Sequence, residues 1–139
     1  MIGNIDDYTF VPVPPSKCRT DAAYDDRMTA ILRAAQALSP DLDFRELVLQ
    51  NQSTAASHAS TVNRPTPNEI MANNNVDSNL LAECRENIVI FDDVLTAGSH
   101  FKAMKQFLRQ YLPEANILGL FVARTAREAD ITSLFDILE

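Results

Sequence analysis

Apolar residues in the N-terminal third of the chain form first a continuous run and then a helical pattern. Tyr8–Val13 (YTFVPV) is a short apolar run closed by two prolines. Because proline cannot continue a hydrogen-bonded ladder, this pattern predicts a strand that runs into a rigid loop. Apolar side chains then recur at helical spacing, at Met28, Ile31, Leu32, Ala35 and Leu38. With Asp25 or Asp26 as the capping residue, they predict a helix over residues 25–38.

The C-terminal half carries the same two kinds of pattern. Residues 87–91 (NIVIF) and 117–123 (ILGLFVA) are uninterrupted apolar runs, typical of strands that are buried on both faces of a parallel sheet. Between them, one apolar face marks a helix over residues 99–112, at Phe101, Met104, Phe107, Leu108, Tyr111 and Leu112. The strand, the helix and the second strand make a βαβ crossover, which should be right-handed.

Three shorter elements complete the prediction. Residues 44–49 (FRELVL) are expected to form a strand, residues 80–84 a short helical piece, and residues 135–138 a short edge strand. Together the elements predict a single α/β domain over residues 1–139, with three layers and a mainly parallel sheet of four or five strands.

Residues 51–79 interrupt this order. The stretch contains seven Asn and two Pro, few charges, and neither a strand nor a helix period. A connection of this length without regular structure is unusual inside a compact domain. We therefore expect a flexible lid over a functional site, a short helix that the pattern does not reveal, or a disordered insertion.

Composition and charge narrow the function classes. The net charge of −7 at pH 7 opposes non-specific binding of nucleic acid, so any phosphate site must be local. No apolar run approaches the roughly 20 residues of a membrane span, and the N-terminus lacks the pattern of a signal peptide. The two cysteines, Cys18 and Cys84, have no zinc-ligand spacing. We expect a cytoplasmic protein with two reduced thiols.

The segment 87–100 (NIVIFDDVLTAGSH) carries the chemistry. Two acids, Asp92 and Asp93, follow a predicted parallel strand, and ligands of open α/β sheets bind at that end of the strands. The N–H groups of residues 95–99 and the first turn of the next helix form an anion nest, which Gly98 leaves open. The hydroxyls of Thr96 and Ser99 add donors. The carboxylates would accept from sugar hydroxyls or hold a hydrated Mg²⁺, which together describes a ribose 5-phosphate site.

Two other interpretations of the acid pair stay open. Response-regulator receivers also end a strand with two acids that bind Mg²⁺, but those acids end the first strand, and too little chain follows Asp93 here. Alternatively, the acids only cap a helix. Adjacent carboxylates are electrostatically unfavourable without a bound partner, which favours a functional pair.

The same segment resembles the phosphoribosyl-pyrophosphate signature of type I phosphoribosyltransferases, in which four apolar residues, two acids and two apolar residues precede a Thr-rich glycine loop. Here these are Ile88–Phe91, Asp92 and Asp93, Val94 and Leu95, and Thr96, Ala97, Gly98 and Ser99. The chain departs from the signature at Ala97 and His100, where the family commonly has hydroxyl side chains. His100 can donate from its ring instead.

A second resemblance covers residues 11–27 (VPVPPSKCRTDAAYDDR), which look like the first strand and pyrophosphate loop of this superfamily, especially its ComF-like branch. The likeness implies that Pro15, Ser16, Lys17 and Arg19 contact pyrophosphate. It also implies that the lid over 51–79 closes on the substrate with Arg64 as its cation. The hood that reads the base in relatives is minimal here, and relatives commonly form homodimers.

The resemblance implies an Mg²⁺-dependent enzyme that transfers the phosphoribosyl group of phosphoribosyl pyrophosphate to a nitrogen acceptor and releases pyrophosphate. The alternative is a non-catalytic relative that senses phosphoribosyl pyrophosphate or a nucleotide, or acts as a partner protein. The departures at Ala97 and His100 and the minimal hood favour this alternative. The acceptor base cannot be read from the sequence.

Overall fold

The computed structural model describes residues 4–15, 17–51, 71–95 and 98–124. After a short 3₁₀ turn, Ile5–Asp7, the helices and strands are β1 (Tyr8–Pro12), α1 (Arg27–Leu38), β2 (Asp43–Phe44), β3 (Val48–Gln50), β4 (Asn74–Val76), α3 (Ser78–Leu81), β5 (Asn87–Leu95), α4 (Ser99–Tyr111) and β6 (Asn116–Arg124). Within this part of the chain, no helix has the length and apolar content needed to cross a bilayer.

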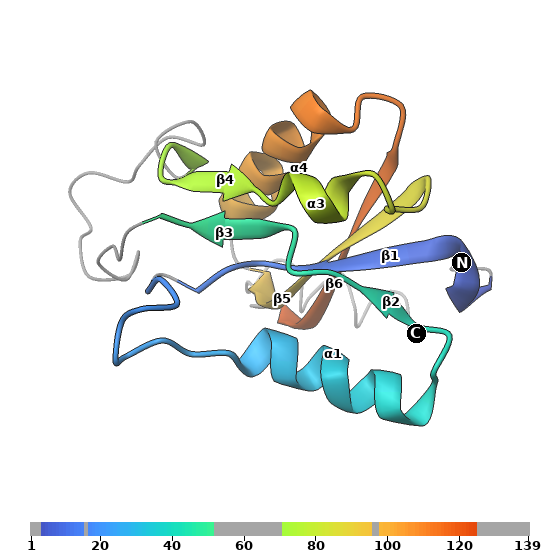
Figure 1. Cartoon of the computed structure of the whole chain (residues 1–139), viewed down its shortest axis with the longest axis horizontal. Coiled ribbons are helices and arrows are strands. Elements are labelled where there is room, and N and C mark those ends of the chain that lie inside the picture. The colour runs from blue at the N-terminus through green and yellow to red at the C-terminus, as the bar shows by residue number, and fades with distance from the viewer. Residues whose placement is uncertain (1–3, 16, 52–70, 96–97, 125–139) are drawn as a thin grey trace, which may run out of the picture.

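Four of the strands form one sheet in the order β2-β1-β5-β6 (Figure 1). Every neighbouring pair in it is parallel. The central pair is β1 with β5, in register from Tyr8 opposite Asn87 to Pro12 opposite Phe91. Strands β3 and β4 form a separate antiparallel pair. The prediction of an α/β domain with a mainly parallel sheet is thereby confirmed.

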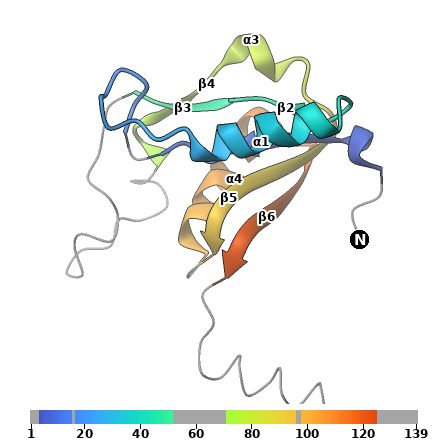
Figure 2. The same cartoon turned by 90° about the horizontal axis from the view of Figure 1, so that it is seen from below.

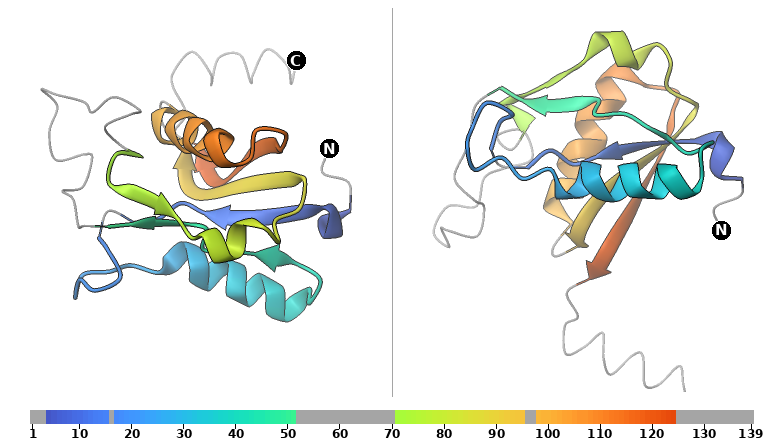
Figure 3. Two further views of the ribbon diagram at one scale, coloured as in Figure 1. Left: turned by 45° about the horizontal axis from the view of Figure 1, so that its top comes forward. Right: turned by 60° about the horizontal axis from the view of Figure 1, so that its bottom comes forward.

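Helices cover both faces of the sheet. Helix α1 lies on one face, and α4 lies on the other together with α3 and the β3–β4 pair (Figures 2 and 3). The core under α1 consists of Phe10, Leu32, Leu42, Val89 and Phe91. The core under α4 consists of Val11, Leu47, Val48, Ile88, Ile90, Met104, Leu108, Ala115 and Ile117. Alternate residues of β1 and β5 enter opposite cores, because side chains alternate along a strand.

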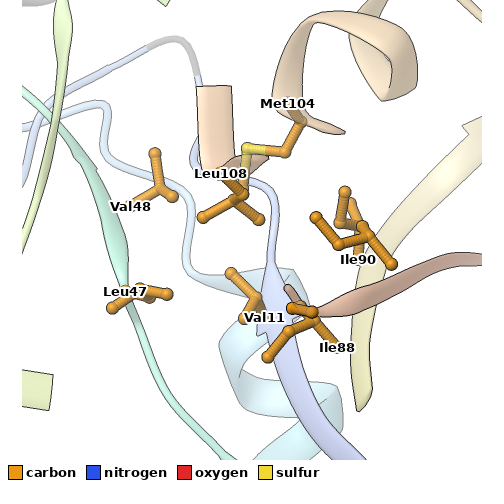
Figure 4. Packing of buried hydrophobic residues seen from close by; sticks show 9 residues of the cluster. Val11, Leu47, Val48, Ile88, Ile90, Met104 and Leu108 are labelled. Atoms are coloured by element: carbon orange, nitrogen blue, oxygen red, sulfur yellow. The ribbon is translucent and has the colours of Figure 1, made fainter. Parts of the chain in front are cut away.

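The core under α4 brings together three parts of the chain (Figure 4). Val11, Ile88 and Ile90 come from the sheet and Met104 and Leu108 from α4, while Leu47 precedes β3 and Val48 is its first residue. Leu47, Ile88, Ile90, Val11 and Leu108 are fully buried. Fully burying such a side chain contributes about 1.5–3 kcal/mol, so this cluster is a main source of stability.

A polar network stabilises the edge of the sheet at which the parallel strands begin. The buried Thr9 donates from Oγ1 to Asp43 Oδ2 over 2.6 Å and accepts from the backbone N–H of Arg85 over 3.0 Å. Arg45 donates to Asp43 and to Glu83, and these hydrogen bonds raise the pKa of the Arg45 guanidinium. The network joins β1, β2 and the segment before β5, so it holds the strand order at this edge.

Two of the predicted elements differ from the structure. The run 44–49 is not one strand: its start belongs to β2 in the parallel sheet, and its end belongs to β3 in the antiparallel pair. Part of the expected lid, residues 71–79, contains β4 and the start of α3. Neither β4 nor α3 shows a clear hydrophobic period in the sequence. β4 has only three residues and pairs with β3 alone. Residues 52–70 and the edge strand expected over 135–138 lie outside the described residues.

Helix α4 packs closely on β6 at Gly119. A Cβ at this position would lie 2.8 Å from Cε2 of Phe101 and 2.9 Å from Cε2 of Phe121. These two rings already pack edge to face, with centroids 5.8 Å apart. We expect Gly119→Val to lower the free energy of unfolding by about 1–3 kcal/mol, the usual cost of overpacking. In chemical denaturation, Ala123→Val, at an exposed position of the same strand, should stay within about 0.5 kcal/mol of the wild type. Equal effects at both positions would contradict this packing.

Candidate functional site at the carboxyl edge of the sheet

The ends of β1 and β5 lie side by side at one edge of the sheet. The two strands are parallel neighbours whose last pair is Pro12 with Phe91, and the N–H of Val13 donates to the carbonyl oxygen of Phe91 over 2.9 Å. From β1 the chain crosses through α1 to β2, whereas from β5 it crosses through α4 to β6 on the other side. The connections diverge between β1 and β5, and ligands of open α/β sheets bind at such a point.

Asp92 and Asp93 come directly after the last residue of β5 that pairs with β1, but they do not follow the end of their strand. The sequence predicted that the strand ends at Phe91, whereas β5 continues through both acids to Leu95. Its pairing with β1 stops at Phe91, and beyond that residue β5 pairs with β6 alone. Both acids therefore belong to a strand and not, as predicted, to a loop. Their backbone is held on one side and open on the side of the β1 loop.

The two carboxyl groups influence each other strongly. The pKa of Asp92 is raised from its ordinary value of 3.8 to about 6, mainly by burial and in smaller part by the charge and hydrogen bonding of the Asp93 carboxylate. The N–H of Asp93, 2.8 Å from Asp92 Oδ1, acts in the opposite direction. On the other side, Asp93 Oδ2 lies 4.0 Å from Arg27 Nη2, at the start of α1. A half-buried acid pair of this kind is typical of functional sites.

Helix α4 starts directly after the predicted phosphate loop. Gly98 precedes it with a φ of 80° and ψ of 4°, a left-handed conformation that glycine adopts without strain. The first helical hydrogen bond runs from the N–H of Lys102 to the carbonyl oxygen of Gly98, so the N–H groups of residues 99–101 point out of the helix start. His100 is exposed on this turn. Thr96 and Ala97 lie outside the described residues.

A pocket of about 150 Å³ lies at the end of β1, between the β1–α1 loop and β3. Three of the predicted pyrophosphate contacts line it, Pro15, Lys17 and Arg19. Asp92 and Asp93 do not line the pocket, but Arg27, which lies 4.0 Å from Asp93, also pairs with the pocket residue Asp25. The structure therefore brings together the two segments that resemble the family, but as neighbouring sites. Ser16 and Arg64 lie outside the described residues.

Glu46 is a pocket residue that the sequence prediction missed. Its Oε1 accepts from Thr29 Oγ1 over 2.9 Å, and its Oε2 forms an ion pair with Arg19. The pattern 44–49 placed Glu46 inside a strand. In the structure β2 ends at Phe44, so Glu46 follows a parallel strand at the same edge as the end of β1. The missing signal was the strand end, which the apolar run 44–49 conceals.

The acid pair suits a hydrated Mg²⁺. This ion binds protein through one or two carboxylates and takes its other ligands from water and substrate phosphates. In the described ranges no group of three or more His, Cys, Asp and Glu could surround a metal. Asp92 and Asp93 would thus hold Mg²⁺ together with water and with oxygen atoms of a bound ligand.

Neither a protein-family model nor a curated protein matches this chain.

The raised pKa of Asp92 predicts a specific pH dependence. Between pH 3.8 and about 6 the folded protein keeps a proton on Asp92 that the unfolded chain has released. The free energy of unfolding therefore loses this contribution as the pH rises through that range. At pH 7 we expect Asp92→Asn to be more stable than the wild type by roughly 1–2 kcal/mol, since solvent screens part of the effect. At pH 4 the two should be alike.

Denaturant titrations of both proteins from pH 4 to pH 7 measure this difference. Asp41→Asn changes an exposed acid before β2, at the other edge of the sheet, and should track the wild type throughout. A constant difference between Asp92→Asn and wild type at all pH values would show that Asp92 is not buried as described.

Gly98 gives a second test of the site. Among the described residues, a Cβ there meets nothing closer than Leu95 Cδ1 at 3.9 Å, so the cost expected comes from the left-handed backbone. We expect Gly98→Ala to lower the free energy of unfolding by about 1–2 kcal/mol. Gly98→Asn should recover part of this loss, because Asn tolerates the left-handed region. Equal melting curves for Gly98→Ala and wild type would contradict the assigned φ.

Proposed function

We propose that this protein is a phosphoribosyltransferase that binds phosphoribosyl pyrophosphate along the carboxyl edge of its sheet. The observation that carries the proposal is the position of the Asp92–Asp93 pair and the Gly98 turn at the point where the connections of β1 and β5 diverge. The likeness of segments 11–27 and 87–100 to type I phosphoribosyltransferases supports it, because β1 and β5 place those two segments side by side.

The proposed roles follow from the order of groups along this edge. The helix start at residues 98–101 would bind the 5-phosphate through backbone N–H groups. Asp92 and Asp93 would accept from the ribose hydroxyls. Lys17 and Arg19, in the neighbouring pocket, would face the pyrophosphate. A bound Mg²⁺ would neutralise charge on the leaving group.

Catalysis would need no protein nucleophile. As the bond to pyrophosphate breaks, positive charge develops on the ribose ring and negative charge on the leaving group. Fixed carboxylates beside the ring and fixed cations beside the pyrophosphate stabilise both charges without reorganisation. The phosphate contact would supply binding energy far from the reacting atom, which helps to orient the ring for attack by the nitrogen acceptor.

A non-catalytic phosphoribosyl-pyrophosphate or nucleotide sensor is the second candidate. The ion pair between Arg19 and Glu46 favours it, because a ligand phosphate must compete with Glu46 for the guanidinium. The chain also lacks hydroxyl side chains at Ala97 and His100. The ion pair weakens the hold on pyrophosphate, and the missing hydroxyls weaken the hold on the 5-phosphate; a sensor needs less of both than an enzyme.

Pyrophosphate release separates the two functions. We expect release from phosphoribosyl pyrophosphate with Mg²⁺ in the presence of at least one purine, pyrimidine or related acceptor. Asp92→Asn and Asp93→Asn should each lower turnover by roughly 10²-fold or more, the usual scale for one preorganised electrostatic group. Asp41→Asn should keep wild-type turnover.

Calorimetry with ribose 5-phosphate and phosphoribosyl pyrophosphate completes the test. Binding that the two acid variants weaken, without turnover on any acceptor, would establish the sensor. If millimolar ligand produces no heat with the wild type, the ribose 5-phosphate site itself is wrong. Early melting of both acid variants with intact binding would identify the acids as structural caps.

A further inference from the structure

Strand β6 leaves an apolar stripe uncovered on the α1 side of the sheet. Leu118, Leu120 and Val122 are 37%, 39% and 63% exposed. Their partners tell which face they share: Val89 lies opposite Leu118, and Phe91 lies opposite Leu120. Both β5 residues are buried in the core under α1. The apolar face of the sheet therefore continues from β5 onto β6, past the cover that α1 provides.

The stripe is not the usual outer face of an edge strand. Edge strands that face water normally carry polar or charged side chains, which prevent association. Here three successive outward positions are Leu, Leu and Val, whereas on the other face Ile117 is buried and Gly119 accommodates the ring of Phe101. An apolar sheet face of this kind is normally buried against another segment or another molecule.

The sequence after β6 contains a matching apolar stripe. Residues 125–139 read TAREADITSLFDILE, with large apolar side chains at Ile131, Leu134, Phe135, Ile137 and Leu138, of which all but Ile137 lie seven positions apart or less in one helical series. The spacing i, i+3, i+4, i+7 is that of one helix face, and Asp130 stands at the capping position before it. The short strand expected over 135–138 contains three of the five apolar positions, whereas the helix face gathers four of them.

We propose that residues 131–138 form an amphipathic helix that packs on the stripe Leu118–Leu120–Val122 of the same chain. A helix of these eight residues is about 12 Å long. The strand segment 118–122 is about 13 Å long. Residues 125–130 provide a connection of the usual length between a strand and a helix.

A segment of the same chain is favoured over a second copy of the protein as the cover of the stripe on β6. Because residues 125–130 link the segment to β6, its effective concentration at the stripe is about millimolar. A second copy of the protein would have to reach a similar concentration in solution to compete. Contact within the chain also buries both apolar stripes together, whereas a second copy on β6 would leave the stripe of 131–138 in water. This inference uses no feature of the proposed ligand site, so it stands or falls independently of the enzymatic function.

Nuclear magnetic resonance on the full chain tests the contact directly. We expect nuclear Overhauser effects between the ring of Phe135 and the methyl groups of Leu120 or Val122. Their absence would overturn the proposal, and this measurement requires no variant to fold.

A mutant cycle tests the energetic coupling. Leu120→Ser and Leu134→Ser should each lower the melting temperature by roughly 3–8 °C. The double variant should melt close to the single variants, because either change already breaks the contact. The matched control Leu38→Ser removes a leucine at the end of α1 that is 88% exposed, and it should melt like the wild type.

Two outcomes of the cycle would contradict the proposal. Additive effects of the Leu120 and Leu134 changes would show that the two stripes do not touch. A wild-type dimer that Leu120→Ser converts to a monomer, with Leu134→Ser still dimeric, would show that a second copy covers β6.

Discussion

The parallel pairing of β1 with β5 is the contact on which the rest of the structure depends. It joins residues that are about 80 positions apart in the chain, from Tyr8 with Asn87 to Pro12 with Phe91. Closing so long a loop costs conformational entropy, and the burial of Val11, Val89 and Ile90 on both faces of the pair offsets that cost. Once the pair forms, the loops after both strands must lie at the same edge of the sheet.

The same pairing explains why the acids of β5 are electrostatically unusual. β1 ends at Pro12, opposite Phe91, so the half-buried Asp92 has a neighbouring strand, β6, on one side only. Burial then raises its pKa, and Asp93 next to it adds repulsion. The protein keeps this arrangement at some expense of stability, and that balance is typical of residues held for binding rather than for folding.

Much of the fold was predictable from the sequence, because long apolar runs and amphipathic helices carry their signal locally. Residues 8–13, 87–91 and 117–123 were recognised as strands and 99–112 as a helix, each within a few residues of the observed bounds. The run FRELVL was misread, since its apolar residues serve two different sheets and nothing local marks the division after Phe44. The misreading also concealed Glu46, the residue that engages Arg19.

The sequence by itself determined which segments become strands and helices, and it marked Asp92, Asp93 and Gly98 as chemically distinctive. Only the tertiary structure decided that β1 lies beside β5, that β5 extends through both acids, and that Glu46 reaches Arg19. The physical reason is the range of the interactions. Periodicity and turn chemistry act between residues a few positions apart, whereas strand order, burial and the pairing of charges depend on contacts between distant segments, which no local pattern specifies.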